Sequence, residues 1–157
     1  MPTEIERKFL VKGDEWRTLA TGTAYRQGYL STKKGCTVRV RLVGNQGYLT
    51  IKGSTKSISR AEYEYPIPAK DAIEMLDNLC EASLIEKTRY KIEFAGLTWE
   101  VDEFAGENQG LIIAEVELAD ENQTIKLPDW IGKEVSDDPR YFNANLVQHP
   151  FSQWSDK

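Results

Sequence analysis

The sequence predicts an α+β fold that is mainly β: an eight-stranded antiparallel β-barrel with flanking helices. Short alternating stretches separated by turn signals follow one another along the chain, which is typical of a single β-rich domain. Seven of the eight predicted strands carry charged residues on one face and apolar residues on the other. One closed sheet accounts for both faces at once, and a barrel of about eight strands has room for side chains or one small ligand.

The first predicted strand, residues 3–11, has one ionic face. Glu4, Glu6 and Lys8 alternate with Ile5 and Arg7, so at a period of two the three charges point the same way. On a helix they would not share a face. Two carboxylates and an ammonium in one row can hold a divalent cation and touch an anion attached to it. The alternative is a solvated sheet face with cross-strand ion pairs.

Seven further stretches read as strands, because polar and apolar residues alternate in them between turn signals. Gly28 is a candidate bulge in the second strand, and residues 44–47 predict the turn of a hairpin. The predicted strands are residues 24–31, 36–43, 48–52, 59–66, 84–94, 97–104 and 111–118.

Apolar residues recur at spacings of three and four between the fifth and sixth strands. Ile73, Leu76, Leu79 and Cys80 form this stripe, which predicts an amphipathic helix over residues 71–80 that covers a sheet. Pro139, just after a run of capping residues, predicts the start of a terminal helix. The other predicted segments are a helical turn or loop at 13–17, loops at 53–57 and 106–110, a short helix at 129–134, the terminal helix from 136 to about 147 and a frayed tail at 150–157.

Composition limits the class of protein. The 157 residues suit one domain, taken as 1–157. A net charge of −5 argues against a general nucleic-acid binder. The longest apolar run, residues 111–114, is too short to span a membrane, and no signal peptide is expected. Cys36 and Cys80 have no metal-ligand or disulfide spacing, which predicts buried free thiols and a cytoplasmic location.

The charged faces leave two arrangements open. The charges can point inward and line a wet tunnel, with the apolar faces outside under the helices, or they can face solvent around an apolar core. The alternation does not choose between them. These charged residues are Glu4, Glu6, Lys8, Arg39, Arg41, Lys52, Glu62, Glu64, Lys87, Arg89, Glu100, Asp102, Glu115 and Glu117.

Inward-facing charges would suit the binding of a phosphate anion together with a divalent cation. Converging lysine and arginine side chains repel one another unless an anion or acidic groups compensate them, and guanidinium groups match phosphate oxygens in pairs. Carboxylates suit Mg²⁺ or Mn²⁺. The single histidine, His149, lies near the tail, which argues against zinc, and no phosphate-binding glycine loop is present.

The ordered set of motifs resembles the CYTH superfamily, the triphosphate tunnel metalloenzymes, and is most similar to its short bacterial inorganic triphosphatases. The resemblance covers most of the chain and implies an eight-stranded antiparallel barrel around a charged tunnel. It is carried by Glu4-x-Glu6-x-Lys8, the run from Tyr25 to Leu30, Arg39-x-Arg41, Thr50-Ile51-Lys52, Glu62-x-Glu64, the run from Glu86 to Tyr90, Glu100-x-Asp102-x-Phe104, Glu115-x-Glu117, Arg140-Tyr141 and Asn143.

The resemblance also implies a role for each charged residue. Phosphate binding falls to Lys8, Arg39, Arg41, Lys52, Lys87 and Arg89. Metal binding falls to Glu4, Glu6, Asp102, Glu115 and Glu117. One metal ion would neutralise phosphate charge and a second would help to activate the attacking water. Lys8 or Lys87 could accept a proton or stabilise the transferring phosphoryl group. Glu62, Glu64 and Glu100 are possible accessory residues that could only balance the basic side chains.

The expected function is therefore metal-dependent hydrolysis of triphosphates, with inorganic tripolyphosphate the favoured small-molecule substrate and Mg²⁺ or Mn²⁺ the cofactor. An adenylate cyclase of this superfamily is the first alternative, but no segment can be assigned to nucleoside recognition. A thiamine triphosphatase is another, with Trp16 or Tyr29 stacking on the organic group. A non-catalytic polyphosphate-binding domain is disfavoured, because anion binding alone needs no metal ligands. The oligomeric state does not follow from the sequence.

Overall fold

The computed structural model describes residues 3–33, 35–54 and 58–155, without the side chains of residues 82 and 83. The strands are β1 Thr3–Val11, β2 Thr23–Ser31, β3 Cys36–Val43, β4 Gln46–Gly53, β5 Ser59–Pro68, β6 Glu81–Phe94, β7 Leu97–Phe104, β8 Ile112–Glu117 and β9 Ile131–Glu134. The α-helices are α1 Ala69–Asn78 and α2 Asn143–Gln148. Short 3₁₀-helices are η1 Glu15–Thr18, η2 Gly106–Asn108, η3 Pro139–Tyr141 and η4 Phe151–Gln153.

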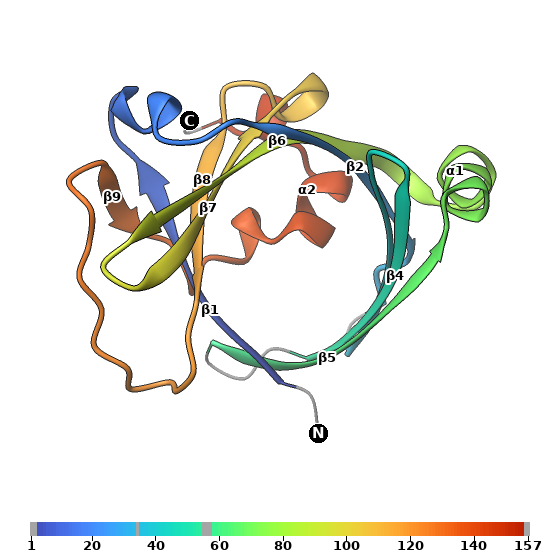
Figure 1. Cartoon of the computed structure of the whole chain (residues 1–157). Helices are drawn as coiled ribbons and strands as arrows, with labels where there is room; N and C mark the ends of the chain where they lie inside the picture. The colour runs from blue at the N-terminus through green and yellow to red at the C-terminus, as the bar shows by residue number, and fades with distance from the viewer. Residues whose placement is uncertain (1–2, 34, 55–57, 156–157) are drawn as a thin grey trace.

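Eight of the strands close into an antiparallel barrel, which confirms the predicted fold (Figure 1). Their order around the barrel is β5-β4-β3-β2-β6-β7-β8-β1, and pairing of β1 with β5 closes the ring. The alternating pattern explains the closure, because each strand presents one apolar and one charged face and an open sheet would leave two edges unpaired.

β1 joins three strands. Its residues 6–10 pair with β8, while its other edge pairs first with β5 and then, at Phe9 and Val11, with β9. The short helix predicted at residues 129–134 is therefore wrong: Ile131–Glu134 is a strand. The far end of β1 extends past β5, and β9 satisfies the backbone groups that would otherwise be left unpaired there.

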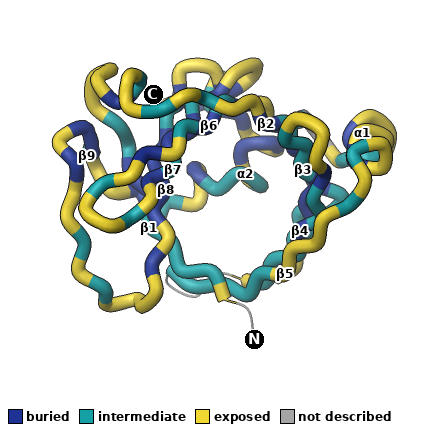
Figure 2. The backbone as a smooth tube through the Cα atoms, viewed as in Figure 1, coloured by how far each residue is buried: buried dark blue, intermediate teal, exposed yellow. Residues whose placement is uncertain are grey.

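Only part of the outer surface of the barrel lies under a helix. α1 packs outside β3 and β4 (Figure 2). There Ala72 and Leu76 pack in one buried cluster with Val40 of β3. The apolar faces of β1, β7 and β8 are covered instead by Trp16 of η1 and by Trp130 in the segment before β9. Among the described helices, α1 and the 3₁₀-helix η1 cover apolar faces as expected, whereas Trp130 covers its part from a segment outside any helix.

Seen along the barrel, α2 lies within the ring of strands (Figure 1). Ile85, Phe104 and Ile113 share the inner faces of β6, β7 and β8 with charged residues, and they pack with Leu146 and Val147 of α2. The barrel interior therefore has two zones, an apolar zone against α2 and a charged zone beyond it.

The C-terminal segment is more ordered than predicted. The terminal helix expected from residue 136 is instead η3 followed by α2, with the Asp138 side chain accepting a hydrogen bond from the Arg140 backbone N–H. The tail expected to fray forms η4, and Trp154 is buried edge-to-face against Tyr141. This indole contributes apolar burial that holds the tail in place. The last two residues lie outside the described part.

The predicted bulge at Gly28 is confirmed. The register of β2 against β6 shifts between Gln27 and Tyr29, and a Cβ at Gly28 would lie 2.6 Å from Leu84 Cδ2. Both cysteines are free, but Cys36 is exposed and Cys80 is only half-buried, so the predicted buried thiols are wrong. In the described residues no helix is both long enough and apolar enough to cross a membrane.

Candidate active site

The charged zone of the barrel contains a cavity of about 690 Å³. Asn143 and Asn145 of α2 lie along its wall. The predicted site residues that line it are Glu4, Glu6, Lys8, Arg39, Arg41, Lys52, Glu62, Glu64, Arg89, Glu100, Glu115 and Glu117. The structure therefore turns the charged faces inward. Lys87 and Asp102 do not line this cavity, because their side chains are 0% and 1% exposed in the wall behind it.

The strand order divides these charges into two halves. Four neighbouring strands, β7, β8, β1 and β5, carry the acidic residues. The opposite strands, β4, β3 and β6, carry Lys52, the two arginines of β3, Lys87 and Arg89. Lys8 is the one predicted phosphate-binding residue that lies in the acidic half. Apart from Lys8 on β1 and Arg60 on β5, the cavity therefore offers oxygen donors on one side and cations on the other.

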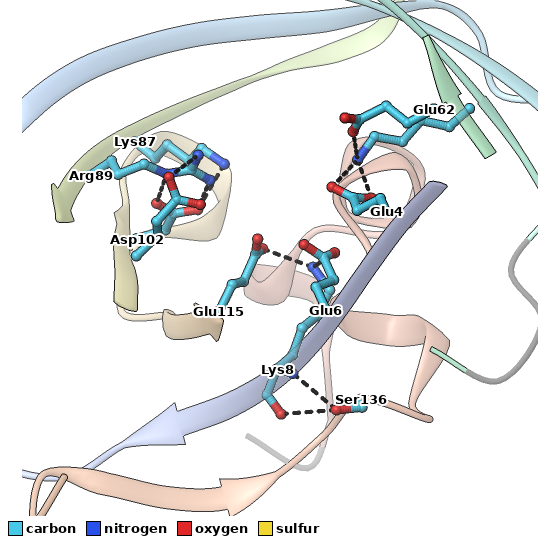
Figure 3. A network of polar contacts seen from close by, with 11 residues as sticks. Glu4, Glu6, Lys8, Glu62, Lys87, Arg89, Asp102, Glu115 and Ser136 are labelled. Atoms are coloured by element: carbon cyan, nitrogen blue, oxygen red, sulfur yellow. Dashed lines mark hydrogen bonds and ion pairs between the residues drawn. The ribbon is translucent and has the colours of Figure 1, made fainter. Parts of the chain in front are cut away.

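A buried cluster anchors the basic half at the junction of β6 and β7 (Figure 3). Arg89 donates two hydrogen bonds to Asp102, at 2.7 Å and 2.8 Å, in the paired geometry that guanidinium and carboxylate groups favour. The Lys87 ammonium lies 2.8 Å from the same carboxylate. Arg89 also lies 3.3 Å from Glu100, which is more exposed. Both oxygens of Asp102 are therefore engaged by cations.

Two further ion-pair groups centre on lysines (Figure 3). Lys8 Nζ donates to Glu115 at 2.8 Å and lies 3.6 Å from Glu6. Lys52 Nζ donates to Glu4 at 2.9 Å. Lys8 and Glu115 lie directly opposite each other in the register of β1 against β8, whereas Lys52 on β4 reaches Glu4 on β1 across the intervening strand β5.

The arginines of β3 have mostly neutral partners. Arg39 donates to the Thr50 hydroxyl at 3.3 Å and lies 3.7 Å from Glu64, to which Thr50 donates. Arg41 donates through Nε to the Gln27 amide oxygen at 3.2 Å. Burial, together with Arg39 and Arg89, lowers the pKa of Arg41 to about 10. The positive charges of Arg39 and Arg41 are therefore less compensated by carboxylates than the charge of Arg89, which Asp102 pairs directly.

The two buried lysines differ in their protonation. Burial, opposed by Asp102 and reinforced by Arg89 and Arg41, lowers the pKa of Lys87 to about 7. Burial also acts against the charge on Lys8, but Glu115 and Glu6 outweigh it and raise the pKa of Lys8 above its ordinary value. Lys8 is therefore a fixed positive charge on the cavity wall, whereas Lys87 can exchange a proton near neutral pH.

Comparison with known proteins identifies the family. The CYTH domain matches residues 2–149. The chain belongs to the CYTH family. It is 56% identical, over 99% of its length and all of the relative, to an inorganic triphosphatase of Acetivibrio thermocellus. An inorganic triphosphatase of Nitrosomonas europaea is 40% identical, with 92% of this chain and 97% of the relative covered. A solved inorganic triphosphatase structure superposes with a TM-score of 0.63 at 35% identity, covering 91% of this chain and 96% of that one.

Membership of the CYTH family implies a divalent metal ion, and the acidic half has the donor chemistry for one. Burial, Glu115 and Glu4 raise the pKa of Glu6 to about 8, despite the opposing charge of Lys8. Burial and nearby carboxylates, Glu4 first among them, also raise the pKa of Glu117, which forms no ion pair with any described residue. A bound cation would relieve this repulsion. Within the described part no three acidic side chains already converge as a metal-binding group.

Arg60, Gln27 and Tyr25 of this CYTH barrel have no site role in the sequence-based predictions, although Gln27 and Tyr25 lie in the run from Tyr25 to Leu30 that carries the resemblance. Arg60 lies on β5 two residues before Glu62 and also lines the cavity, so the same alternation could have found it. Gln27 and Tyr25 lie on β2, whose inner face has no charge to draw attention to it. A period-two reading of β2 against β3 would have placed both beside Arg41.

The raised pKa of Glu6 makes a testable prediction for the metal-free protein. Between pH 4.5 and about 8 the folded state holds a proton on Glu6 that the unfolded state has released, so this group's contribution to stability falls as the pH rises. Thermal melts in chelator should therefore show Glu6→Gln gaining stability relative to wild type from pH 5 to pH 9.

Glu134→Gln is the matched control, because the hydrogen bond from Arg7 lowers the pKa of Glu134. Its contribution is present above the ordinary glutamate pKa and is lost in acid. This variant should lose stability relative to wild type as the pH rises from 3 to 7. If the melting temperatures of Glu6→Gln and wild type change in parallel with pH, the raised pKa of Glu6 is contradicted.

Proposed function

We propose that this CYTH protein is an enzyme that hydrolyses triphosphates with the help of a divalent metal ion, and that inorganic tripolyphosphate is its favoured substrate. The division of one cavity into an acidic and a basic half is the observation that carries the proposal. A triphosphate with bound metal is itself divided in this way, since its oxygens seek cations and its metal seeks carboxylates. The relatives that bear the name inorganic triphosphatase support the same substrate class.

The basic half would hold the phosphate chain. Arg39 and Arg41 share a face of β3, so both can reach one anion, and Lys52 lies on the neighbouring strand β4. Arg89 completes the row from β6, with Lys87 adding positive charge behind it. Guanidinium groups bind phosphate oxygens in pairs, which fixes the orientation of the chain as well as its affinity.

The acidic half would hold the metal ions, which are Mg²⁺ or Mn²⁺ in the proposal because both favour oxygen ligands. When bound, they supply charge neutralisation to the phosphate and activation to the attacking water. Glu4, Glu6, Glu115 and Glu117 are the proposed ligands. Asp102 would have to leave Lys87 and Arg89 to act as one, so in the proposal it fixes those two side chains from behind.

The remaining charged side chains would set the balance of charge around the substrate. Lys8 keeps its positive charge within the acidic half, where it can stabilise negative charge that develops on the transferring phosphoryl group. Lys87 is the proposed proton-exchanging group, because its pKa lies near 7. Glu62, Glu64 and Glu100 balance Lys52, Arg39 and Arg89, as their ion pairs indicate.

Product analysis separates this function from its rivals. Purified protein is incubated with tripolyphosphate, ATP and thiamine triphosphate, each with Mg²⁺ and with Mn²⁺. The proposal expects phosphate release that is fastest from tripolyphosphate. Cyclic AMP from ATP would favour a cyclase, faster turnover of thiamine triphosphate would favour that substrate, and binding without products would indicate a non-catalytic domain. A cytoplasmic location, with no nucleic-acid or membrane partner, is part of the proposal.

Glu117→Gln tests the metal assignment, because it keeps the side-chain shape and removes the charge. Mutation of a residue that only supports a metal ligand typically lowers metal affinity or activity by about 10- to 100-fold. Loss of a ligand itself should cost at least as much, so activity at limiting metal should fall by about 10-fold or more. Thermal melts should change little, since Glu117 is exposed and without an ion pair among the described residues. Saturation curves at several metal concentrations are the measurement, and normal turnover at limiting metal would remove Glu117 from the ligand set.

A further inference from the structure

Arg41 differs from the other predicted phosphate-binding residues in having no carboxylate partner. Lys8, Lys52, Lys87, Arg39 and Arg89 each lie within 4.0 Å of an aspartate or glutamate oxygen. No described carboxylate lies within that distance of Arg41. Arg41 is half-buried in the cavity wall, and a cation withdrawn even in part from water is costly without a counter-ion unless neutral polar groups or an anion compensate it.

Two neutral side chains of β2 surround this guanidinium. Gln27 is 0% exposed and its amide oxygen accepts a hydrogen bond from Arg41 Nε at 3.2 Å. The guanidinium carbon of Arg41 lies 5.1 Å from the centre of the Tyr25 ring, and that of Arg89 lies 4.9 Å from the same ring. Both distances are within the range of a cation–π interaction.

The orientation of the Gln27 amide indicates that this side chain serves Arg41. A guanidinium has only donors, so the amide oxygen must face it. The amide nitrogen is then buried with no hydrogen-bond partner among the described residues. Leaving a buried donor unpaired carries a cost, and a glutamate of nearly the same shape would avoid it. Such a glutamate would also neutralise Arg41.

We propose that Gln27 and Tyr25 are positioning residues that hold Arg41 in place without neutralising it, so that its full positive charge is directed at the phosphate chain. Tyr25 extends the same support to Arg89, which lies on β6, the other strand that pairs with β2. The inference rests on the proposed function, because the charge is kept for a polyphosphate anion.

The test is the affinity of the full chain for inorganic tripolyphosphate, measured by titration calorimetry in chelator so that no turnover occurs. Gln27→Met removes the hydrogen bond but keeps the length of the side chain. It should lower the affinity by about 10-fold in the wild-type background, in line with one hydrogen bond to a charged group. In an Arg41→Ala background the same change should lower it less than about 2-fold.

A pair of variants at Tyr25 covers the case in which Gln27→Met does not fold. Tyr25→Leu keeps apolar volume without the aromatic face and should weaken binding by about 3-fold or more, while Tyr25→Phe should retain most of the affinity. Equal losses from Gln27→Met in both backgrounds, or equal affinities for the leucine and phenylalanine variants, would overturn the inference and leave the proposed function standing. Wild-type protein that does not bind tripolyphosphate would overturn both.

Discussion

Replacing Asp102 with alanine is expected to lower the free energy of unfolding by about 3–5 kcal/mol, the cost of removing one partner from a buried ion pair. Asp102 is 0% exposed and accepts both hydrogen bonds from Arg89 while it also contacts Lys87. Without it, the Arg89 guanidinium would stay buried without its main carboxylate partner, and the pKa of Lys87, which Asp102 raises, would fall further. For a chain of this size the loss corresponds to a fall in melting temperature of roughly 6–20 °C.

Asp77→Ala is the matched control for this experiment. Asp77 also accepts from an arginine, Arg26, at 2.7 Å, but half of its side chain is exposed. An exposed pair of this kind contributes about 0–1 kcal/mol. Thermal or denaturant unfolding of both variants is the measurement. Similar losses for the two aspartates would show that the Asp102 cluster does not hold the barrel wall together.

Arg41→Ala is expected to weaken tripolyphosphate binding by about 10- to 100-fold, because a charge-assisted hydrogen bond contributes roughly 1.5–3 kcal/mol. The fold should tolerate the change better than most buried substitutions. Arg41 has no acidic partner to strand, and its burial beside Arg39 and Arg89 already lowers its pKa. Saturation curves and melts of the same preparation separate the two effects.

Arg26→Ala provides the comparison on the opposite face of the same pair of strands. Arg26 lies on β2 opposite Leu42, and its guanidinium points outward to Asp77. Its removal should leave the apparent affinity for tripolyphosphate unchanged. If Arg26→Ala and Arg41→Ala weaken binding equally, the effect is a general change in net charge and the assignment of Arg41 to the phosphate chain fails.

Alternation along the chain predicted the composition of the cavity wall. A period of two placed Glu4, Glu6 and Lys8 on one face, and the structure turns that face inward. Alternation fixes which residues share a face, but the direction of the face depends on barrel closure. The pairing of β1 with β5, more than fifty residues apart, determines that closure, and no local pattern reports it.

The partners within the wall could not be predicted for the same reason. Lys8 meets Glu115 only because the register of β1 against β8 aligns them. Asp102, expected among the metal ligands, lies opposite Arg89 on β6 and is engaged there. The short strand β9 could not be predicted from its own sequence either. Its four residues form a strand because they pair with the edge of β1 that β5 leaves free. The single-domain boundary at 1–157 and the role of each site residue stay predictions.

Phosphate release from tripolyphosphate by the wild-type protein, measured with and without divalent metal, tests the central claim most directly. The basic half alone should bind the anion in chelator, because Arg39, Arg41 and Lys52 line the cavity without help from a metal. Hydrolysis should appear only when Mg²⁺ or Mn²⁺ is added, since in the proposal Glu4, Glu6, Glu115 and Glu117 hold the metal ion that activates the attacking water. Full hydrolytic activity after exhaustive chelation would contradict it.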